Sequence, residues 1–424
     1  MQKPNASNPW TWIPTLYFGQ AIPYVVVMVL AVVIYKDFGI SNDDIAFYTS
    51  WLYLPWVIKP FWSPFIDMFR TKRWWTVGMQ FIIGASLASV ALTTHLPMFF
   101  QMSLAILWLM AFSSATHDIA ADGFYMLALP QHQQAAFVGV RSTFYRLANI
   151  AGQGGLVYLA GALTELTGNV AYAWSVVLFV AAGLFLSLWA YHCFILPRPA
   201  SDHKVAQSDH YVAEYFATFR AFFVRKDILL VLGFILTFRL GESQLIKMVI
   251  PFLKDPALKG GLGLATKQVG VVYGTVGVLF LTLGGLLGGY LISKFGLKRC
   301  LWLMVFAVHL PDLAFVFLAS TLPQNIFIVG GCIALEQFGY GLGFTALMLY
   351  MIMVSEGEHK TAHYAICTGL MAAGMMLPGM YAGKIQELLG YQHFFMYVCL
   401  MTLPAFLMAA LVNIDPQFGK KAEE

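Results

Sequence analysis

The chain has 424 residues, of which 59% are apolar and only 11% are charged. A soluble domain has about 25% charged residues, because its surface must stay wet. This composition therefore excludes an ordinary soluble protein. The formal net charge of +4 is small for the length and gives no sign of nucleic-acid binding.

Twelve apolar segments follow one another along the chain. A run of about 20 apolar residues can cross the hydrocarbon core of a bilayer. The backbone groups of such a run must bond within the run, which predicts helices. We therefore predict an all-α membrane protein with twelve transmembrane helices. The segments are residues 10–35, 45–62, 74–93, 98–127, 135–163, 171–194, 228–253, 269–294, 300–319, 326–353, 361–388 and 393–412.

The basic residues in the loops predict the orientation, because Lys and Arg gather on the cytoplasmic side. With a cytoplasmic N-terminus, fifteen basic residues lie inside and five lie outside, so we expect both termini in the cytoplasm. The inside residues are Lys3, Arg70, Lys72, Arg73, Arg198, Lys204, Arg220, Arg225, Lys226, Lys294, Lys298, Arg299, Lys360, Lys420 and Lys421; the outside ones are Lys36, Lys254, Lys259, Lys267 and Lys384.

The longest polar interval, residues 197–226, divides the chain into a half of six segments at 1–196 and another at 227–424. Within this linker, aromatic residues recur at helical spacing with basic residues among them. The pattern indicates an amphipathic helix on the anionic inner leaflet. An early start of the seventh span fits the same periodicity, and the sequence leaves both interpretations open.

Two loops resemble each other. A shift of 226 residues aligns Phe69 with Phe295, and the basic pair Lys72 and Arg73 with Lys298 and Arg299. Both copies lie on the predicted cytoplasmic side between equivalent helices. The match favours a duplicated plan of two parallel six-helix halves.

The second loop resembles the loop motif of the major facilitator superfamily, G-x-L-a-D-r-x-G-r-k, with Ser293 in place of the acid, whereas the first loop keeps it as Asp67. Three further stretches resemble the branch of AmpG-like muropeptide permeases and acetyl-coenzyme A transporters. They are LPWVIKPFWSP at 54–64, ATHDIAAD at 115–122 and TAHYA at 361–365. This chain has His117 where that branch typically has Gln.

The resemblance implies a secondary transporter in which the first, fourth, seventh and tenth helices line the cavity. We expect a proton-coupled importer of a polar, anionic cell-wall fragment, like an anhydromuropeptide, or of a sugar derivative. It would act as a monomer in a bacterial inner membrane, in contact with lipid and without a cofactor. The alternatives are an exporter of drugs or metabolites of the same superfamily, or a membrane protein that is not a transporter.

Other sources of activity have no signature. No Walker loop indicates ATP-driven transport, and no HExxH motif or clustered nucleophile indicates an enzyme. The five cysteines lie in or beside apolar runs without a CxxC pair. We expect neither a disulfide nor a metal site, because buried cysteines commonly act as small apolar residues.

Four charged residues lie on the fourth and fifth predicted helices. Asp118 and Asp122 share a helix face. Asp122 lies nine residues before the turn near Gln131 and Arg141 ten after it, so the two have nearly equal depth. The same count places Asp118 level with Arg146. Two structural salt bridges are one interpretation. The other makes one Asp a proton carrier and one Arg an anchor for substrate.

Two polar stripes have the spacing i, i+3, i+7, which favours one wet helix face. We expect them to bind substrate, although the two Tyr of the second stripe fit plain helix packing equally well. The stripes are Arg146, Asn149 and Gln153 on the fifth helix, and Tyr17, Gln20 and Tyr24 on the first.

The seventh and tenth helices also carry polar residues near mid-span. Arg239 and Glu242 lie three residues apart and can pair along the helix. We expect Arg239 and Gln337 to bind substrate, and Glu242 is a further candidate for proton coupling. Glu336 is followed by Gln337 and has no basic residue near it in sequence. A buried carboxyl group can bind and release protons in the working pH range, so Glu336 is the first candidate for proton coupling. A structural, hydrogen-bonded acid is the alternative.

Three other charged residues have simpler interpretations. Lys59 can extend to the cytoplasmic interface, where it and Asp67 would act as gating or structural charges together with Arg141. Asp312 lies on the ninth helix, which is peripheral in this superfamily, so we assign it no role.

The first prediction is topological. Single cysteines placed at residues 200–210 and at both termini should react with membrane-impermeant maleimide only after the inner membrane is opened, since the basic residues place these segments inside. Labelling of 200–210 in intact cells would overturn the orientation.

Overall fold

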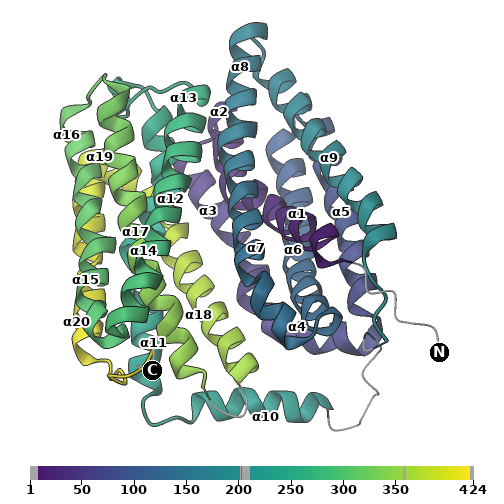
Figure 1. Ribbon diagram of the computed structural model, residues 1–424. Coiled ribbons are helices and arrows are strands. Elements are labelled where there is room, and N and C mark those ends of the chain that lie inside the picture. The colour runs from purple at the N-terminus through teal and green to yellow at the C-terminus, as the bar shows by residue number, and fades with distance from the viewer. Residues whose placement is uncertain (1–7, 201, 203–210, 357–359, 421–424) are drawn as a thin grey trace. The chain divides into compact units, whose positions relative to one another are not determined.

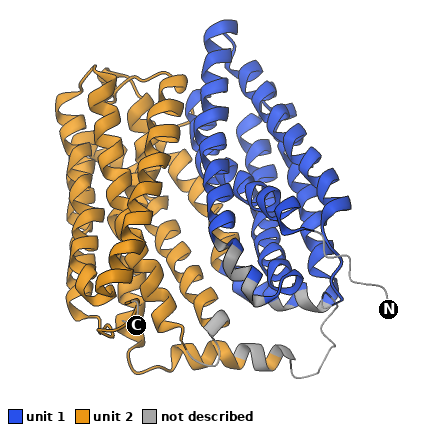
Figure 2. Ribbon diagram, in the orientation of Figure 1, with its two compact units in different colours: residues 1–38, 58–212 blue, residues 39–57, 213–424 orange. Residues whose placement is uncertain are grey.

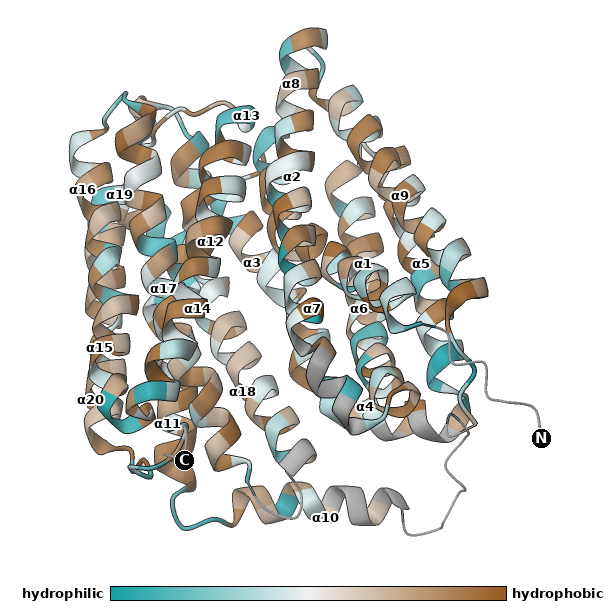
Figure 3. Cartoon of the chain, viewed as in Figure 1, coloured by the Kyte–Doolittle hydropathy of each residue, from teal (hydrophilic) through white to brown (hydrophobic). Residues whose placement is uncertain are grey.

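The computed structural model describes residues 8–200, 202, 211–356 and 360–420 (Figure 1). These residues form helices and connecting turns, with no strand among them. Helices satisfy their backbone groups internally, as a bilayer requires. The expected all-helical class is confirmed, and Figure 3 shows hydrophobic residues along most of the long helices.

The chain forms two compact units, coloured separately in Figure 2. Unit 1 holds residues 1–38 and 58–212, and unit 2 holds residues 39–57 and 213–424. Residues 39–57 therefore pack with the C-terminal part of the chain. The division into halves at 1–196 and 227–424 stays a prediction.

Unit 1 is a bundle of long helices with two π-helical stretches. The wider turns of η2 and η3 lie close together, and a Cβ at Gly152 would lie 2.6 Å from Val25 Cγ1. Such stretches are frequent at functional sites. The elements are η1 (Pro9–Thr11), α1 (Ile13–Val25), η2 (Val26–Leu30), α2 (Ala31–Asp37), the larger part of α4 (Leu54–Phe69), α5 (Lys72–Thr93), α6 (Phe99–Ala128), α7 (Gln131–Ile150), η3 (Ala151–Leu156), α8 (Val157–Thr167) and α9 (Val170–Ile195).

Unit 2 contains α3 and the helices that follow the linker. Its elements are α3 (Asn42–Trp51), α10 (Tyr211–Phe223), α11 (Ile228–Thr237), α12 (Leu240–Lys254), η4 (Ala257–Lys259), α13 (Thr266–Val269), η5 (Gly270–Gly277), α14 (Val278–Phe295), α15 (Leu297–His309), η6 (Leu310–Asp312), α16 (Leu313–Thr321), α17 (Ile326–Val354), α18 (Lys360–Met380), α19 (Ala382–Met401) and α20 (Leu403–Leu411).

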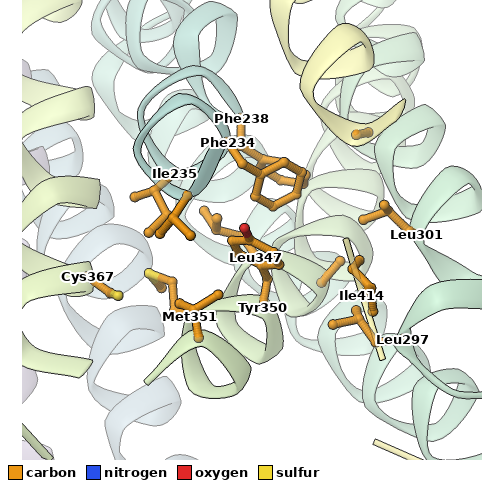
Figure 4. Close-up of a cluster of buried hydrophobic side chains, with 14 of the residues drawn as sticks. Phe234, Ile235, Phe238, Leu297, Leu301, Leu347, Tyr350, Met351, Cys367 and Ile414 are labelled. Atoms are coloured by element: carbon orange, nitrogen blue, oxygen red, sulfur yellow. The ribbon is translucent and has the colours of Figure 1, made fainter. Parts of the chain in front are cut away.

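The core of unit 2 is a cluster of buried apolar side chains around α11 and α17 (Figure 4). The rings of Phe234 and Tyr350 have centroids 4.4 Å apart. Cys367 of α18 and Ile414, beyond α20, complete the same cluster. Since contacts between such side chains add up, this cluster stabilises the packing of α10, α11, α14, α15, α17, α18 and α20.

The helix α3 is held in unit 2 by polar contacts. Asn42 Nδ2 donates to Gln386 Oε1 at 2.7 Å and lies 3.2 Å from Asp255 Oδ2. Lys247 Nζ donates to Thr49 Oγ1 at 2.9 Å. All five residues of these contacts are buried, where unpaired polar groups are costly, so these bonds fix the register of α3.

The predicted linker at 197–226 contains the helix α10. The buried ring of Phe222 lies 5.4 Å from the ring of His363, measured between centroids. His363 Nε2 lies 3.3 Å from the Thr218 carbonyl oxygen. α10 is thus a separate helix that contacts α18, and its place on the membrane surface stays a prediction.

Nine helices in the described residues are long and apolar enough to cross a membrane. The expected segments 45–62, 135–163 and 361–388 are helical but are not among the nine. The first is broken between α3 and α4. The last is divided between α18, which ends at Met380, and α19, which begins at Ala382 and has a kink at Gly390, where φ is 71°. Multiple spanning helices are shown, and the count of twelve stays a prediction.

The second prediction concerns the contact of α14 with α17. A Cβ at Gly284 would lie 2.1 Å from the Phe338 carbonyl oxygen, whereas Gly289 has nothing within 4 Å of its Cβ position. Gly284→Ala should destabilise the protein by about 1–3 kcal/mol, the usual cost of overpacking, and lower its apparent Tm in detergent. Gly289→Ala is the control and should not lower it. Equal Tm values for the two variants would contradict the close contact.

Candidate functional site

An ion pair in unit 1 links α6 to α7. Arg141 Nη2 donates to Asp122 Oδ1 at 2.6 Å. The Tyr17 hydroxyl, on α1, donates to the same oxygen at 3.1 Å. The sequence placed the two charges at equal depth in a helical hairpin, and the structure brings them together. Charge-assisted bonds of this kind are short and strong.

Two aromatic rings complete the surroundings of Arg141. Its guanidinium carbon lies 4.1 Å from the ring centroid of Tyr17 and 4.3 Å from that of Tyr125. Such cation–π contacts contribute about 0.5–2 kcal/mol each. The sequence analysis missed Tyr125, although it lies three residues after Asp122 and so shares its helix face. Arg141 is thereby held in one orientation.

Asp118 lies one helical turn before Asp122, and its Oδ2 is 4.0 Å from Lys59 Nζ on α4. Both side chains are partly exposed, so solvent screens this pair. Tyr145 of α7 interacts electrostatically with Tyr24, Asp118 and Asp122. Lys59 therefore lies beside a predicted site residue. The side chain of Asp67 lies outside the described residues.

A cavity of about 530 Å³ opens beside these groups in unit 1. Pockets that bind small molecules typically have about 300–1,000 Å³. Ser142 and Tyr145 were not predicted as site residues. Their spacing could have indicated them, because Arg141 and Tyr145, and likewise Ser142 and Arg146, lie four residues apart on one helix face. The lining residues are Tyr17, Gln20, Arg141, Ser142, Tyr145 and Arg146.

The remaining residues of the fifth-helix stripe form a chain along their own helix. Asn149 Nδ2 donates to the Tyr145 carbonyl oxygen at 2.8 Å, and Gln153 Nε2 lies 3.3 Å from Asn149 Oδ1. Gln153 belongs to η3, where the helix is wider. These two side chains and Tyr24 are outside the set that lines the cavity. Substrate binding by them stays a prediction.

His117, which departs from the family pattern, is fully buried in unit 1. Its Nε2 lies 3.1 Å from Gln80 Nε2, and Gln80 Oε1 lies 3.0 Å from His192 Nδ1. His192 Nε2 is 2.9 Å from the Thr15 hydroxyl. This chain links α6, α5, α9 and α1 through buried polar bonds, although His117 Nδ1 has no hydrogen-bond partner in the described residues. His117 therefore has a structural explanation.

Arg239 of unit 2 lies at the break between α11 and α12, at the N-cap position of α12, and its side chain makes no capping bond. Its Nη2 donates to the Tyr340 hydroxyl at 2.6 Å. Its guanidinium carbon lies 4.9 Å and 5.0 Å from the ring centroids of Tyr340 and Phe344. Both rings belong to α17, so Arg239 joins the predicted seventh and tenth helices.

Two acidic side chains near Arg239 are almost completely buried. Glu242 is 0% exposed and Glu336 is 1% exposed. Gln337 Nε2 donates to Glu336 Oε2 at 2.9 Å. Within the described residues, Glu336 Oε1 and both carboxylate oxygens of Glu242 have no hydrogen-bond partner. Glu242 interacts electrostatically with Arg239 and with Glu336, so the structure groups these predicted residues.

Comparison with solved structures defines the class of protein. A nucleoside transporter, NupG, has a TM-score of 0.69 at 16% identity, covering 94% of this chain and 98% of its own. A D-xylose–proton symporter has a TM-score of 0.67 at 13% identity, covering 94% and 95%. With its membrane-length helices in two units, the chain has the fold of the major facilitator transporters.

Residues 24–291 match the family described as the BT1 family, and the chain belongs to that family. The putative transporter AmpG 4 of Rickettsia conorii is 24% identical over 403 residues, covering 92% of this chain and 93% of its own. The anhydromuropeptide permease of Escherichia coli strain K12 is 24% identical over 360 residues, covering 83% and 69%. The resemblance to AmpG-like permeases is confirmed. The prediction of a transporter rather than an enzyme is confirmed as well.

The third prediction is a double-mutant cycle. Asp122→Asn leaves the Arg141 charge without its partner, so it should lower both the apparent Tm and substrate uptake. Arg141→Gln added to Asp122→Asn should restore part of the loss, because it removes a guanidinium group that has lost its carboxylate partner. The two side chains are 27% and 44% exposed, so solvent screens the pair, and we expect a coupling of about 0.5–1 kcal/mol.

The control cycle pairs Arg141→Gln with Glu165→Gln. Glu165 lies 24 residues further along the continuous helix, roughly 36 Å at 1.5 Å per residue. Substitutions at distant sites are additive within about 0.5 kcal/mol. Additive effects in the Asp122 cycle as well would contradict a functional or structural partnership between the two residues.

Proposed function

We propose that the protein is a proton-coupled importer that carries a polar, anionic cell-wall fragment, like an anhydromuropeptide, across the inner membrane by alternating access. The observation that carries the proposal is the cavity of unit 1, which combines two guanidinium groups with phenol, amide and hydroxyl groups. A substrate with carboxylate groups and sugar hydroxyls matches this lining. The relatives named as AmpG transporters and as an anhydromuropeptide permease support the same class of substrate.

The two arginines of the cavity have different proposed roles. Arg141 is bonded to Asp122 and lies against two rings, so we assign it a positioning role. Arg146 lines the same cavity one turn further along the chain. We assign Arg146 as the anchor of a substrate carboxylate, because a planar guanidinium can donate two parallel hydrogen bonds to it.

The neutral part of the substrate would contact the remaining cavity groups. Gln20 and Ser142 present hydrogen-bonding side chains, and Tyr17 and Tyr145 present rings with hydroxyl groups. Sugar hydroxyls need both donors and acceptors. Asn149, Gln153 and Tyr24 would extend this site in a conformation in which they face the solute.

The driving force would come from unit 2. Glu336 is buried, and one of its carboxyl oxygens has no hydrogen-bond partner in the described residues. A charged group inside a membrane span is costly and is therefore a candidate for function. We assign Glu336 as the group that binds and releases the coupled proton, with Glu242 beside it and Arg239 and Gln337 holding the two carboxyl groups in place.

The arrangement in the cell follows from the loop charges. We propose a monomer with both termini in the cytoplasm, in which alternation of access moves the solute and the proton together. The proton gradient of a bacterial inner membrane would supply the free energy for accumulation.

The fourth prediction tests the coupling. Glu336→Gln keeps the shape and hydrogen bonding of the side chain but removes its titration. In proteoliposomes with a pH gradient, this variant should lose accumulation of radiolabelled anhydromuropeptide above equilibrium. It should keep substrate binding and counterflow exchange, since the unit 1 cavity is unchanged.

The matched control is Glu356→Gln, the same substitution at an exposed residue beyond the end of α17, which should accumulate substrate like the wild type. Proton-dependent accumulation by Glu336→Gln would remove Glu336 from the coupling role, and Asp118 or Glu242 would become the next candidates. Uptake by the wild type that ignores the pH gradient would refute proton coupling as a whole.

A further inference from the structure

One face of α17 lies against α15 and η6 with little space between the backbones. Glu336, Gly339 and Gly343 follow the spacing i, i+3, i+7 and share this face. A Cβ at Gly339 would lie 2.0 Å from the Ala307 carbonyl oxygen and 2.9 Å from Pro311 Cγ. Only a residue without a side chain permits this approach. The face that carries Glu336 therefore contacts the segment around Pro311.

Asp312 follows Pro311 directly and is the last residue of η6. Its side chain is only 1% exposed, and neither of its carboxyl oxygens has a hydrogen-bond partner in the described part of the chain. It interacts electrostatically with Glu242 and with Glu336. The sequence analysis gave Asp312 no role, whereas the structure places it with the two acidic residues of the proposed coupling site.

Other titratable groups surround the three carboxyl groups. Arg239 and Lys247 lie on or beside α12, but Lys247 donates to Thr49 of α3. The rest come from α15, α17, α19 and η5. They are His309, one turn before Asp312, Tyr340, which bonds Arg239, Cys399, which interacts with Asp312, and Tyr273, which interacts with Glu242 and Glu336.

Charge balance limits the states of this group. With all three carboxyl groups ionised, Arg239 would neutralise only one of them. An excess of negative charge in a membrane interior is costly, and interacting carboxyl groups take up and lose protons as a set. With Arg239 charged, two protons distributed among Glu242, Asp312 and Glu336 make the group neutral.

We propose that Asp312 is the proton-exchange partner of Glu336 in the coupling site. The two carboxyl groups are not hydrogen-bonded to each other in the described residues, so the proton passes through water: the O–H bond of the protonated Asp312 breaks as the water accepts that proton, and the water gives another proton to the Glu336 carboxylate. The reverse relay restores Asp312. No electrons change hands, and the proton leaves to water when the site opens. The inference rests on the proposed proton coupling at Glu336, and it adds a third carboxyl group from outside the helices expected to line the cavity.

The test is infrared difference spectroscopy of the purified full-length protein during steps of pH, which needs no substrate. The carbonyl stretch of protonated carboxyl groups should change with pH. Labelling with ¹³C-aspartate should shift one component of this change, and Asp312→Asn should remove that component. The labelled wild type gives a result even if the variant folds poorly. A pH-dependent signal without any ¹³C-aspartate shift would overturn the role of Asp312.

Uptake measurements supply the second readout. Asp312→Asn should lose gradient-driven accumulation of radiolabelled anhydromuropeptide while keeping counterflow exchange, and Asp312→Glu should recover part of it. Cys399→Ala removes a neighbour of Asp312 without removing a carboxyl group and should accumulate like the wild type. Loss of accumulation in Cys399→Ala to the same extent would show that packing near Asp312 matters and would overturn the proposal.

The two proposals fail in different ways. If Glu336→Gln loses accumulation but Asp312→Asn keeps both accumulation and the infrared component, only the inference about Asp312 is wrong. If Asp312→Asn keeps gradient-driven accumulation while His309→Gln loses it, the exchange partner is His309, whose imidazole has no carboxyl stretch, and the proposal is again wrong. If the wild type ignores the pH gradient, the proposed function itself fails.

Discussion

The cost of placing a charge in a low-dielectric medium is the constraint on which this structure depends. Every ionisable side chain in a membrane span needs an opposite charge, a hydrogen-bond partner or water. In unit 1, Asp122 meets this need through Arg141 and Tyr17. Asp118 has Lys59 at 4.0 Å. The helices that supply these groups are thereby held in register, and the cavity forms beside them.

Unit 2 meets the same constraint differently. Three buried acidic residues lie near one cation, Arg239. Arg239 interacts with Glu242, while Glu336 and Asp312 lie close by. Protons are the remaining means of neutralising such a group. The cost of burying charge is thus met in two ways, by fixed charged partners in unit 1 and by exchangeable protons in unit 2. We therefore assign substrate binding to unit 1 and proton coupling to unit 2.

Much of this could be predicted from the sequence, because local rules determine it. Apolar runs predicted helices, and equal depth in a hairpin placed Asp122 with Arg141. Contacts between distant segments were not predictable. Asp312 was set aside because the family places its helix at the periphery, and only the close approach at Gly339 brings it to Glu336. His117 stood out as a departure, but its bonds to Gln80 depend on tertiary packing.

The helix α3 has a consequence for biosynthesis. Its bonds to the rest of unit 2 join residues far apart in sequence: 344 positions separate Asn42 from Gln386 and 198 separate Thr49 from Lys247. The ribosome adds about 5–20 residues per second. For tens of seconds, α3 is therefore already synthesised while its partners are still being made. Completion of unit 2 must be a late step of folding, reached only when almost the whole chain has been translated.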